Sequence, residues 1–124
     1  MDYIPKRKSE ANVQAELYSQ LKAAGFVCEL EYKVKRPGER GARLDVIIIQ
    51  DGQIPAIIEV KNHAKPEETK ANWKRRAQYM RYSRFGVPVL ICPAAEYIPE
   101  TVAQVREILE QSSRIYPARR ASAG

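Results

Sequence analysis

Two charged residues interrupt one of the most apolar stretches of this chain. In QIPAIIEVKN, residues 53–62, the branched apolar side chains are typical of a buried strand, whereas Glu59 and Lys61 are not. Residues two apart in a strand face the same side, so the carboxylate and the ammonium group should emerge together where the strand ends. The two charges are therefore predicted to form one local site.

A second carboxylate lies in the preceding apolar run, LDVIII. Asp45 in this run is costly to bury unless it is paired, protonated or bound to a metal. The dipeptide Asp51-Gly52 between the two runs predicts a hairpin, which places Asp45 opposite a position near 58 or 59. Asp45 and Glu59 should then lie side by side. A divalent cation would relieve their repulsion, and oxygen ligands of this kind suit Mg²⁺, with Mn²⁺ as a substitute.

A metal held by two carboxylates beside a lysine is suited to phosphodiester hydrolysis. The metal would neutralise charge that develops on the phosphate and lower the pKa of a water molecule, while Lys61 would hold or deprotonate that water or stabilise the pentacovalent state. An alternative is that Glu59 and Lys61 form only a half-exposed ion pair, which is worth less than about 1 kcal/mol. The presence of Asp45 on the paired strand favours the site.

The elements that must position these residues follow from apolar periodicity and turn signals. The pattern predicts a helix with Ser9 as N-cap and Gly25 as its stop, three strands, a helix with Trp73, Ala77 and Met80 on one stripe, a strand, and a last helix. Their ranges are 9–24, 26–34, 44–49, 54–61, 67–84, 87–92 and 99–113. Both central strands are apolar on both faces, so helices should cover the sheet on each side, with Trp73 and Met80 in the core. The predicted fold class is α/β.

The pattern of Asp45, thirteen further residues and then Glu59-Val60-Lys61 resembles the PD-(D/E)xK nuclease superfamily. That family has the restriction-endonuclease-like fold, with a core order αβββαβ and a mixed sheet flanked by helices, which is similar to the order over residues 9–92. The resemblance implies that Asp45 and Glu59 ligate the metal, that the Val60 carbonyl often helps, and that Lys61 acts on the water. Leu44 departs from the pattern, because it stands where the motif's name has proline.

Two accessory positions follow from the same resemblance. Members of the superfamily often carry a glutamate on the first helix, which Glu16 matches as a catalytic and metal-binding candidate, and a Gln with a Tyr four residues on, which Gln78 and Tyr82 match. The alternatives are that Glu16 only belongs to the polar face of its helix and that Gln78 and Tyr82 are surface residues. His63 directly follows the motif and is interpreted as a loop histidine or a phosphate contact.

Basic residues cluster on both sides of the motif strand. The net charge is +6, with seven Lys/Arg against two Glu in residues 65–84 and five against one Glu in residues 33–43. Such a cluster can be a solvated face, but beside a phosphate-cutting site it favours contacts with a nucleic-acid backbone. The candidates are Arg36, Arg40, Arg43, Lys70, Lys74, Arg75 and Arg81. DNA is the expected partner, and RNA is not excluded.

Length and composition predict one domain over residues 1–124 with a loose tail from about 114. No run is long and apolar enough to span a membrane, and the N-terminus does not resemble a signal peptide, so a cytoplasmic location without a membrane is expected. Cys28 and Cys92 should be buried free thiols, since two cysteines do not make a disulfide framework or a zinc site.

The expected function is that of a Mg²⁺-dependent endonuclease acting on DNA. The resemblance implies a homodimer, and the compact archaeal Holliday junction resolvases are similar in size and layout. Two alternatives stay open: a nucleic-acid-binding module that lacks the chemistry, and an interaction subunit of a larger restriction or mobile-element system. Metal-dependent cleavage separates these alternatives.

Overall fold

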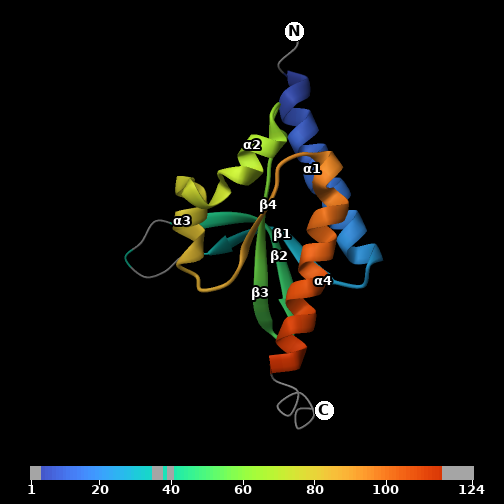
Figure 1. Ribbon diagram of the computed structural model, residues 1–124, viewed down its shortest axis with the longest axis vertical. Coiled ribbons are helices and arrows are strands. Elements are labelled where there is room, and N and C mark those ends of the chain that lie inside the picture. Colours follow the sequence, from blue (N-terminus) through green and yellow to red (C-terminus); the bar gives the residue numbers. More distant parts are fainter. Residues whose placement is uncertain (1–3, 35–37, 39–40, 116–124) are drawn as a thin grey trace.

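The structure is a computed structural model that describes residues 4–34, 38 and 41–115 (Figure 1). These residues form an α/β fold with a four-stranded mixed sheet and four α-helices. The elements in chain order are α1 (Ile4–Ala23), β1 (Val27–Val34), β2 (Ala42–Gln50), β3 (Gln53–Val60), α2 (Pro66–Ala71), the 3-10 turn η1 (Trp73–Arg75), α3 (Ala77–Ser83), β4 (Val89–Cys92), the 3-10 turn η2 (Ala95–Tyr97) and α4 (Ile98–Ile115).

The sheet has the order β1-β2-β3-β4, in which the first three strands are antiparallel and β4 runs parallel to β3. The predicted hairpin between β2 and β3 is confirmed. Its two turn residues, Asp51 and Gly52, both have positive φ angles, 53° and 75°, as a type I′ turn requires. Pro88 stands immediately before β4, which is an edge strand and tolerates a residue without an N–H group there.

Helices cover both faces of the sheet, as the apolar strands predict (Figure 1). On one face, α1 and α4 pack through side chains such as Leu17, Leu21 and Val105 on Val46 and Ile58 of the central strands. On the other face, α2, η1 and α3 cover a second cluster. That cluster contains Leu44, Ile47, Ile57, Trp73, Tyr82, Val89 and Ile91.

Both cysteines are buried free thiols, which confirms the prediction. Burial raises the pKa of the Cys28 thiol and of the Cys92 thiol. Both side chains belong to the cluster under α1 and α4. They therefore act as small apolar core residues.

The first helix begins earlier than the sequence pattern predicts. It starts at Ile4, so Ser9 lies within the helix and is not its N-cap. The predicted stop is correct, because Gly25 follows the helix with a φ of 96° and its N–H donates to the Lys22 carbonyl. The Phe26 N–H donates to the Leu21 carbonyl, which completes a Schellman-type C-terminus.

The predicted continuous helix over 67–84 is wrong. Asn72 ends α2 with its side-chain amide bonded to the Glu68 carbonyl at 3.0 Å, and Arg76 has extended backbone angles before α3. The break turns Trp73 into the core, where its indole N–H donates to the Val89 carbonyl at 3.0 Å. Met80, predicted as a core residue, is 61% exposed. Trp73 is therefore core as predicted, whereas Ala77 and Met80 do not continue a buried stripe with it.

The remaining boundaries differ from the predictions by one or two residues. The last helix extends to Ile115, so the first residues of the predicted loose tail are helical, and residues 116–124 lie outside the described residues. Within the described part of the chain, no helix has the length and apolar character needed to cross a membrane.

Candidate active site

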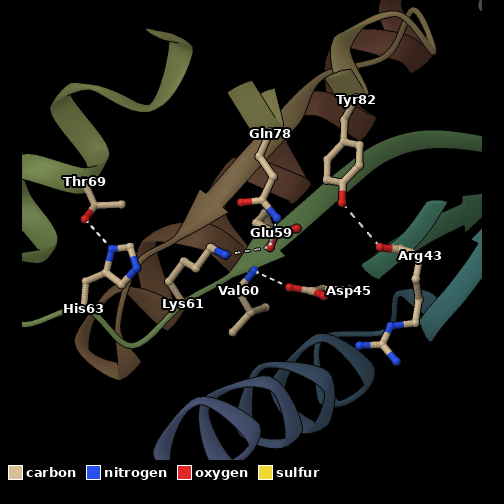
Figure 2. A network of polar contacts seen from close by, with 9 residues as sticks. All are labelled: Arg43, Asp45, Glu59, Val60, Lys61, His63, Thr69, Gln78 and Tyr82. Carbon is tan, nitrogen blue, oxygen red and sulfur yellow. Dashed lines mark hydrogen bonds and ion pairs between the residues drawn. The ribbon is translucent and has the colours of Figure 1, made fainter. Parts of the chain in front are cut away.

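The two carboxylates of the motif meet on the central pair of strands. Regular pairing joins Val46 to Ile58, and one step further along the hairpin lie Asp45 and Glu59. The backbone N–H of Val60 donates to Asp45 Oδ2 at 2.9 Å (Figure 2). This bond fixes the Asp45 side chain against the end of β3, so the predicted juxtaposition of the motif's two halves is present.

Asp45 lies where β2 departs from simple alternation. Leu44 and Val46 would share a face in a regular strand, but Leu44 packs in the cluster under α3 and Val46 in the cluster under α1 and α4. On the neighbouring strand, Glu31 lies level with Asp45 and has a φ of 52°. The local twist leaves Asp45 half-buried at the change of face.

Glu59 is a buried carboxylate whose two oxygens have different surroundings. Only 3% of the surface of Glu59 is exposed. Oε2 accepts a hydrogen bond from Gln78 Nε2 at 2.9 Å and lies 3.2 Å from the Lys61 ammonium nitrogen (Figure 2). Oε1 is fully buried and has no hydrogen-bond partner among the residues that the structure describes. A buried carboxylate oxygen without a partner is costly, which indicates a place for a bound cation or proton.

The electrostatics of Asp45 and Glu59 also indicate a bound cation or proton. Burial, followed by the charge of Asp45, raises the pKa of Glu59 to about 7, while Lys61 acts in the opposite direction. Near neutral pH the Glu59 carboxyl group is therefore close to its titration midpoint. One nearby ammonium group does not offset both burial and the second carboxylate.

These residues fit a magnesium ion. Asp45 and the unpaired oxygen of Glu59 offer hard oxygen ligands, and Mg²⁺ commonly takes one or two carboxylates and keeps several waters. In the described residues no group of three or more His, Cys, Asp or Glu side chains is placed to hold a metal. The site would thus supply two carboxylates, and the predicted contribution of the Val60 carbonyl remains a prediction.

The predicted role of Glu16 finds no support in the geometry. Its side chain is exposed and accepts a hydrogen bond from Gln20 on the same helix at 2.9 Å. Among the described side chains of α1, Gln14 reaches the site, and its amide donates to the Asp45 backbone carbonyl at 3.4 Å. At 3.6 residues per turn, Gln14 and Glu16 flank opposite sides of the buried Leu17, and only Gln14 is on the side toward β2. Helix phase relative to Leu17 is the sequence signal that separates them.

Gln78 is brought to the site as predicted, because it donates to Glu59 from α3. Tyr82, one turn further along, is buried and not a surface residue. Its hydroxyl donates to the Arg43 carbonyl at 3.4 Å, and burial, then the charge of Glu59, raises its pKa (Figure 2). Tyr82 therefore ties α3 to β2 beside the carboxylates.

His63 lies on the segment that leaves β3. Its Nδ1 is 2.7 Å from the hydroxyl oxygen of Thr69 on α2, and its backbone N–H donates to the Pro93 carbonyl (Figure 2). Thr69 was not anticipated from the sequence, which carries no motif that marks it. These bonds hold the segment after Lys61 against α2 and the end of β4.

The basic candidates divide into three groups. Lys74, Arg75 and Arg81 are exposed on η1 and α3, and Arg43 is exposed on β2 at 3.8 Å from Glu31. Lys70 is paired with Glu100 on α4 and lies over the Tyr97 ring, so its charge already has a partner. Arg36 and Arg40 lie outside the described residues.

Comparison of the chain with protein-family models, with curated proteins and with solved structures gives no match.

Proposed function

We propose that this chain is a Mg²⁺-dependent endonuclease that hydrolyses phosphodiester bonds in DNA, built on a restriction-endonuclease-like fold. The observation that carries the proposal is the buried Glu59 carboxylate, with one oxygen unpartnered, beside Asp45 and Lys61. An ion pair that served only stability would not need the second carboxylate. The arrangement of helices and strands around the pair supports the same fold.

Each side chain has a role that its contacts allow. Asp45 is oriented by the Val60 N–H, and Glu59 is oriented by Gln78. Bound Mg²⁺ would neutralise the phosphate and activate the attacking water, and Mn²⁺ would substitute for it. Lys61, at the end of β3 and only partly exposed, is placed to hold that water and to stabilise negative charge on the phosphate. Gln78 is a positioning residue for Glu59.

Exposed basic side chains support nucleic acid as the substrate. Lys74 and Arg75 are on η1 and Arg81 is on α3, and these segments cover the face of the sheet on which Gln78 of α3 contacts Glu59. Lysine and arginine contacts of this kind position a phosphate backbone without reading its sequence. A homodimer, with one site for each strand, suits cleavage of a duplex.

Cleavage assays with matched variants test the proposal. Supercoiled plasmid, branched DNA and single-stranded RNA are incubated with the protein in Mg²⁺ or Mn²⁺ and in EDTA. Wild type is expected to cut DNA only with metal, and Asp45→Asn and Lys61→Ala are expected to bind DNA but not cut it. Lys22→Ala, which removes an exposed lysine of α1, is the control and should cut like wild type.

The outcomes separate the alternatives. Equal DNA binding by wild type and variants, with no cleavage by any of them, would identify a nucleic-acid-binding module. Cleavage that appears only after a partner protein is added would identify an interaction subunit of a larger system. Faster cleavage of RNA than of DNA would change the substrate class and keep the chemistry.

A further inference from the structure

The two edge strands of the sheet differ in exposure. β4 is one edge, and three of its four residues are buried. β1 is the other edge, pairs only with β2 among the described residues, and has one buried residue in eight. Val27, at 61%, and Leu30, at 37%, are two of the large hydrophobic residues exposed in the described part of the chain. An exposed edge strand offers unpaired backbone groups to another strand.

The charges on β1 are only partly matched by the strand beside it. Lys33 is paired directly with Arg43 on β2, which places two positive charges opposite each other. Glu31 lies between the registered pairs Leu30–Val46 and Tyr32–Leu44 and has a φ of 52°. The one ion pair of these side chains within the described residues joins Glu31 to Arg43 at 3.8 Å, with both side chains more than half exposed. The pairing with β2 therefore accounts for the charge of Glu31 but not for that of Lys33.

The pattern is complementary to itself. In the sequence ELEYKVK, residues 29–35, acidic residues precede Tyr32 and basic residues follow it at mirror-image positions. When two copies of the strand run antiparallel with Tyr32 facing Tyr32, Glu31 of each copy faces Lys33 of the other, and Leu30 faces Val34. The sequence continues the symmetry by one step, although Lys35 lies outside the described residues.

Neighbouring self-pairing registers lack this complementarity. Centring the pair on Leu30 puts Glu29 opposite Glu31. Centring it on Glu31 or on Lys33 puts two identical charges opposite each other on the axis. Like charges directly opposite each other destabilise a strand pair, so the sequence selects the register centred on Tyr32.

We propose that the β1 edges of two copies of this chain pair antiparallel about a twofold axis at Tyr32, so that the two sheets become one continuous sheet. Symmetric strand addition of this kind uses the same surface on both subunits. The inference does not depend on the nuclease activity, because neither Glu31 nor Lys33 belongs to the candidate active site. The positive φ of Glu31 limits the length of regular pairing, which predicts a dimer that dissociates on dilution.

Charge exchange across the axis provides the test. Glu31→Lys and Lys33→Glu each replace two attractive pairs by two repulsive ones, so each variant alone should have a dimer dissociation constant roughly tenfold or more above that of wild type. An equal mixture of the two variants restores both attractive pairs and should form heterodimers. The double variant Glu31→Lys/Lys33→Glu restores them within one chain and should dimerise like wild type.

Sedimentation velocity over a range of concentrations measures these states, with circular dichroism to show that each variant is folded. The control Lys22→Glu makes the same lysine-to-glutamate change as Lys33→Glu, but on α1, and should dimerise like wild type. If Glu31→Lys does not fold, Lys33→Glu and the neutral Lys33→Gln retain the test, with the larger loss expected for the charge reversal. A monomeric wild type, single variants that dimerise like wild type, or a mixture no more dimeric than its components would overturn the proposal.

Discussion

The two faces of the sheet are covered in different ways. On one face, α1 and α4 are long continuous helices, and the cluster beneath them is built from apolar side chains and two buried thiols. On the other face, three short helical segments cover a second buried cluster that adjoins Glu59, Gln78 and Lys61. Both faces belong to the same strands, so the difference arises from what each covering segment contributes.

This difference separates stability from chemistry. Long helices bury many apolar groups in regular stripes, which favours the folded state but leaves no place for a charged group. The breaks at Asn72 and Arg76 let Trp73, Gln78 and Tyr82 approach the sheet from different directions. A fragmented cover can therefore surround a carboxylate that a continuous helix would have to exclude.

The largest predicted effect is on the DNA cleavage rate. It should follow from removing the Lys61 ammonium group on the face covered by α2, η1 and α3. Lys61→Ala is expected to lower the DNA cleavage rate by about 10²–10⁴-fold, the usual range for a positioned group that handles a proton. The free energy of unfolding should also fall, because Lys61 is the ion-pair partner of the buried Glu59 carboxylate, so the cleavage rate is compared per folded molecule. A loss of activity that only matched the loss of folded protein would contradict the assignment of chemistry to this face.

A cavity on the other face should have the opposite profile. Leu17, a residue of α1, is fully buried against the sheet, and Leu17→Ala is expected to cost about 2–5 kcal/mol in the free energy of unfolding. Under conditions where the variant is still folded, its cleavage rate per folded molecule should equal that of wild type. Urea titration and a plasmid assay on the same preparation measure the two quantities. A variant with normal stability would show that α1 does not pack as described.

Glu59 should make stability depend on pH. Its pKa rises from 4.5 to about 7 on folding, so the folded state holds more protons than the unfolded state between these values. The contribution of Glu59 to the free energy of unfolding is then fully present below about pH 4.5, and it is lost as the pH rises from there through about 7. The decrease should be roughly 3 kcal/mol, since one unit of pKa corresponds to about 1.4 kcal/mol.

Glu59→Gln removes the titrating group and should flatten that decrease. Urea titrations of wild type and variant at a series of pH values measure the difference. Added Mg²⁺ should stabilise wild type at neutral pH, because it offsets the repulsion between the two carboxylates, and should stabilise the variant less. If the free energies of unfolding of the two proteins had parallel pH profiles, the raised pKa of the buried Glu59 carboxyl group would be contradicted.

The smallest effect is expected at Met80. Its side chain is 61% exposed on α3, so Met80→Ser should change the free energy of unfolding by no more than about 0.5 kcal/mol. The same substitution in a continuous amphipathic helix with Met80 on its buried stripe would cost several times more. A large loss of stability in thermal unfolding would therefore indicate that Met80 is buried, as in a continuous helix. It would contradict the described difference between the two faces.

The features that could be predicted from sequence depend on local rules. The Asp51-Gly52 turn fixes the register of the hairpin, and strand alternation then places Asp45 beside Glu59 and Lys61. Gln78 was predicted through a family resemblance, and the structure places it on Glu59.

The features that could not be predicted depend on contacts between distant residues. The break after α2 is stabilised by the Trp73 bond to Val89, sixteen residues away, and apolar periodicity does not report such a contact. The choice of Gln14 over Glu16 depends on how α1 is rotated against β2, which tertiary packing decides. The pairing of Lys70 with Glu100 joins helices thirty residues apart.

The most direct test of the central claim is the anomalous scattering of a crystal of this protein soaked in Mn²⁺. A peak between the carboxylate groups of Asp45 and Glu59, in contact with the buried Glu59 Oε1, is the predicted result. The peak should be absent from crystals of Asp45→Asn treated in the same way. A wild-type crystal that contains Mn²⁺ elsewhere but none between these two side chains would contradict the claim that they form a metal site.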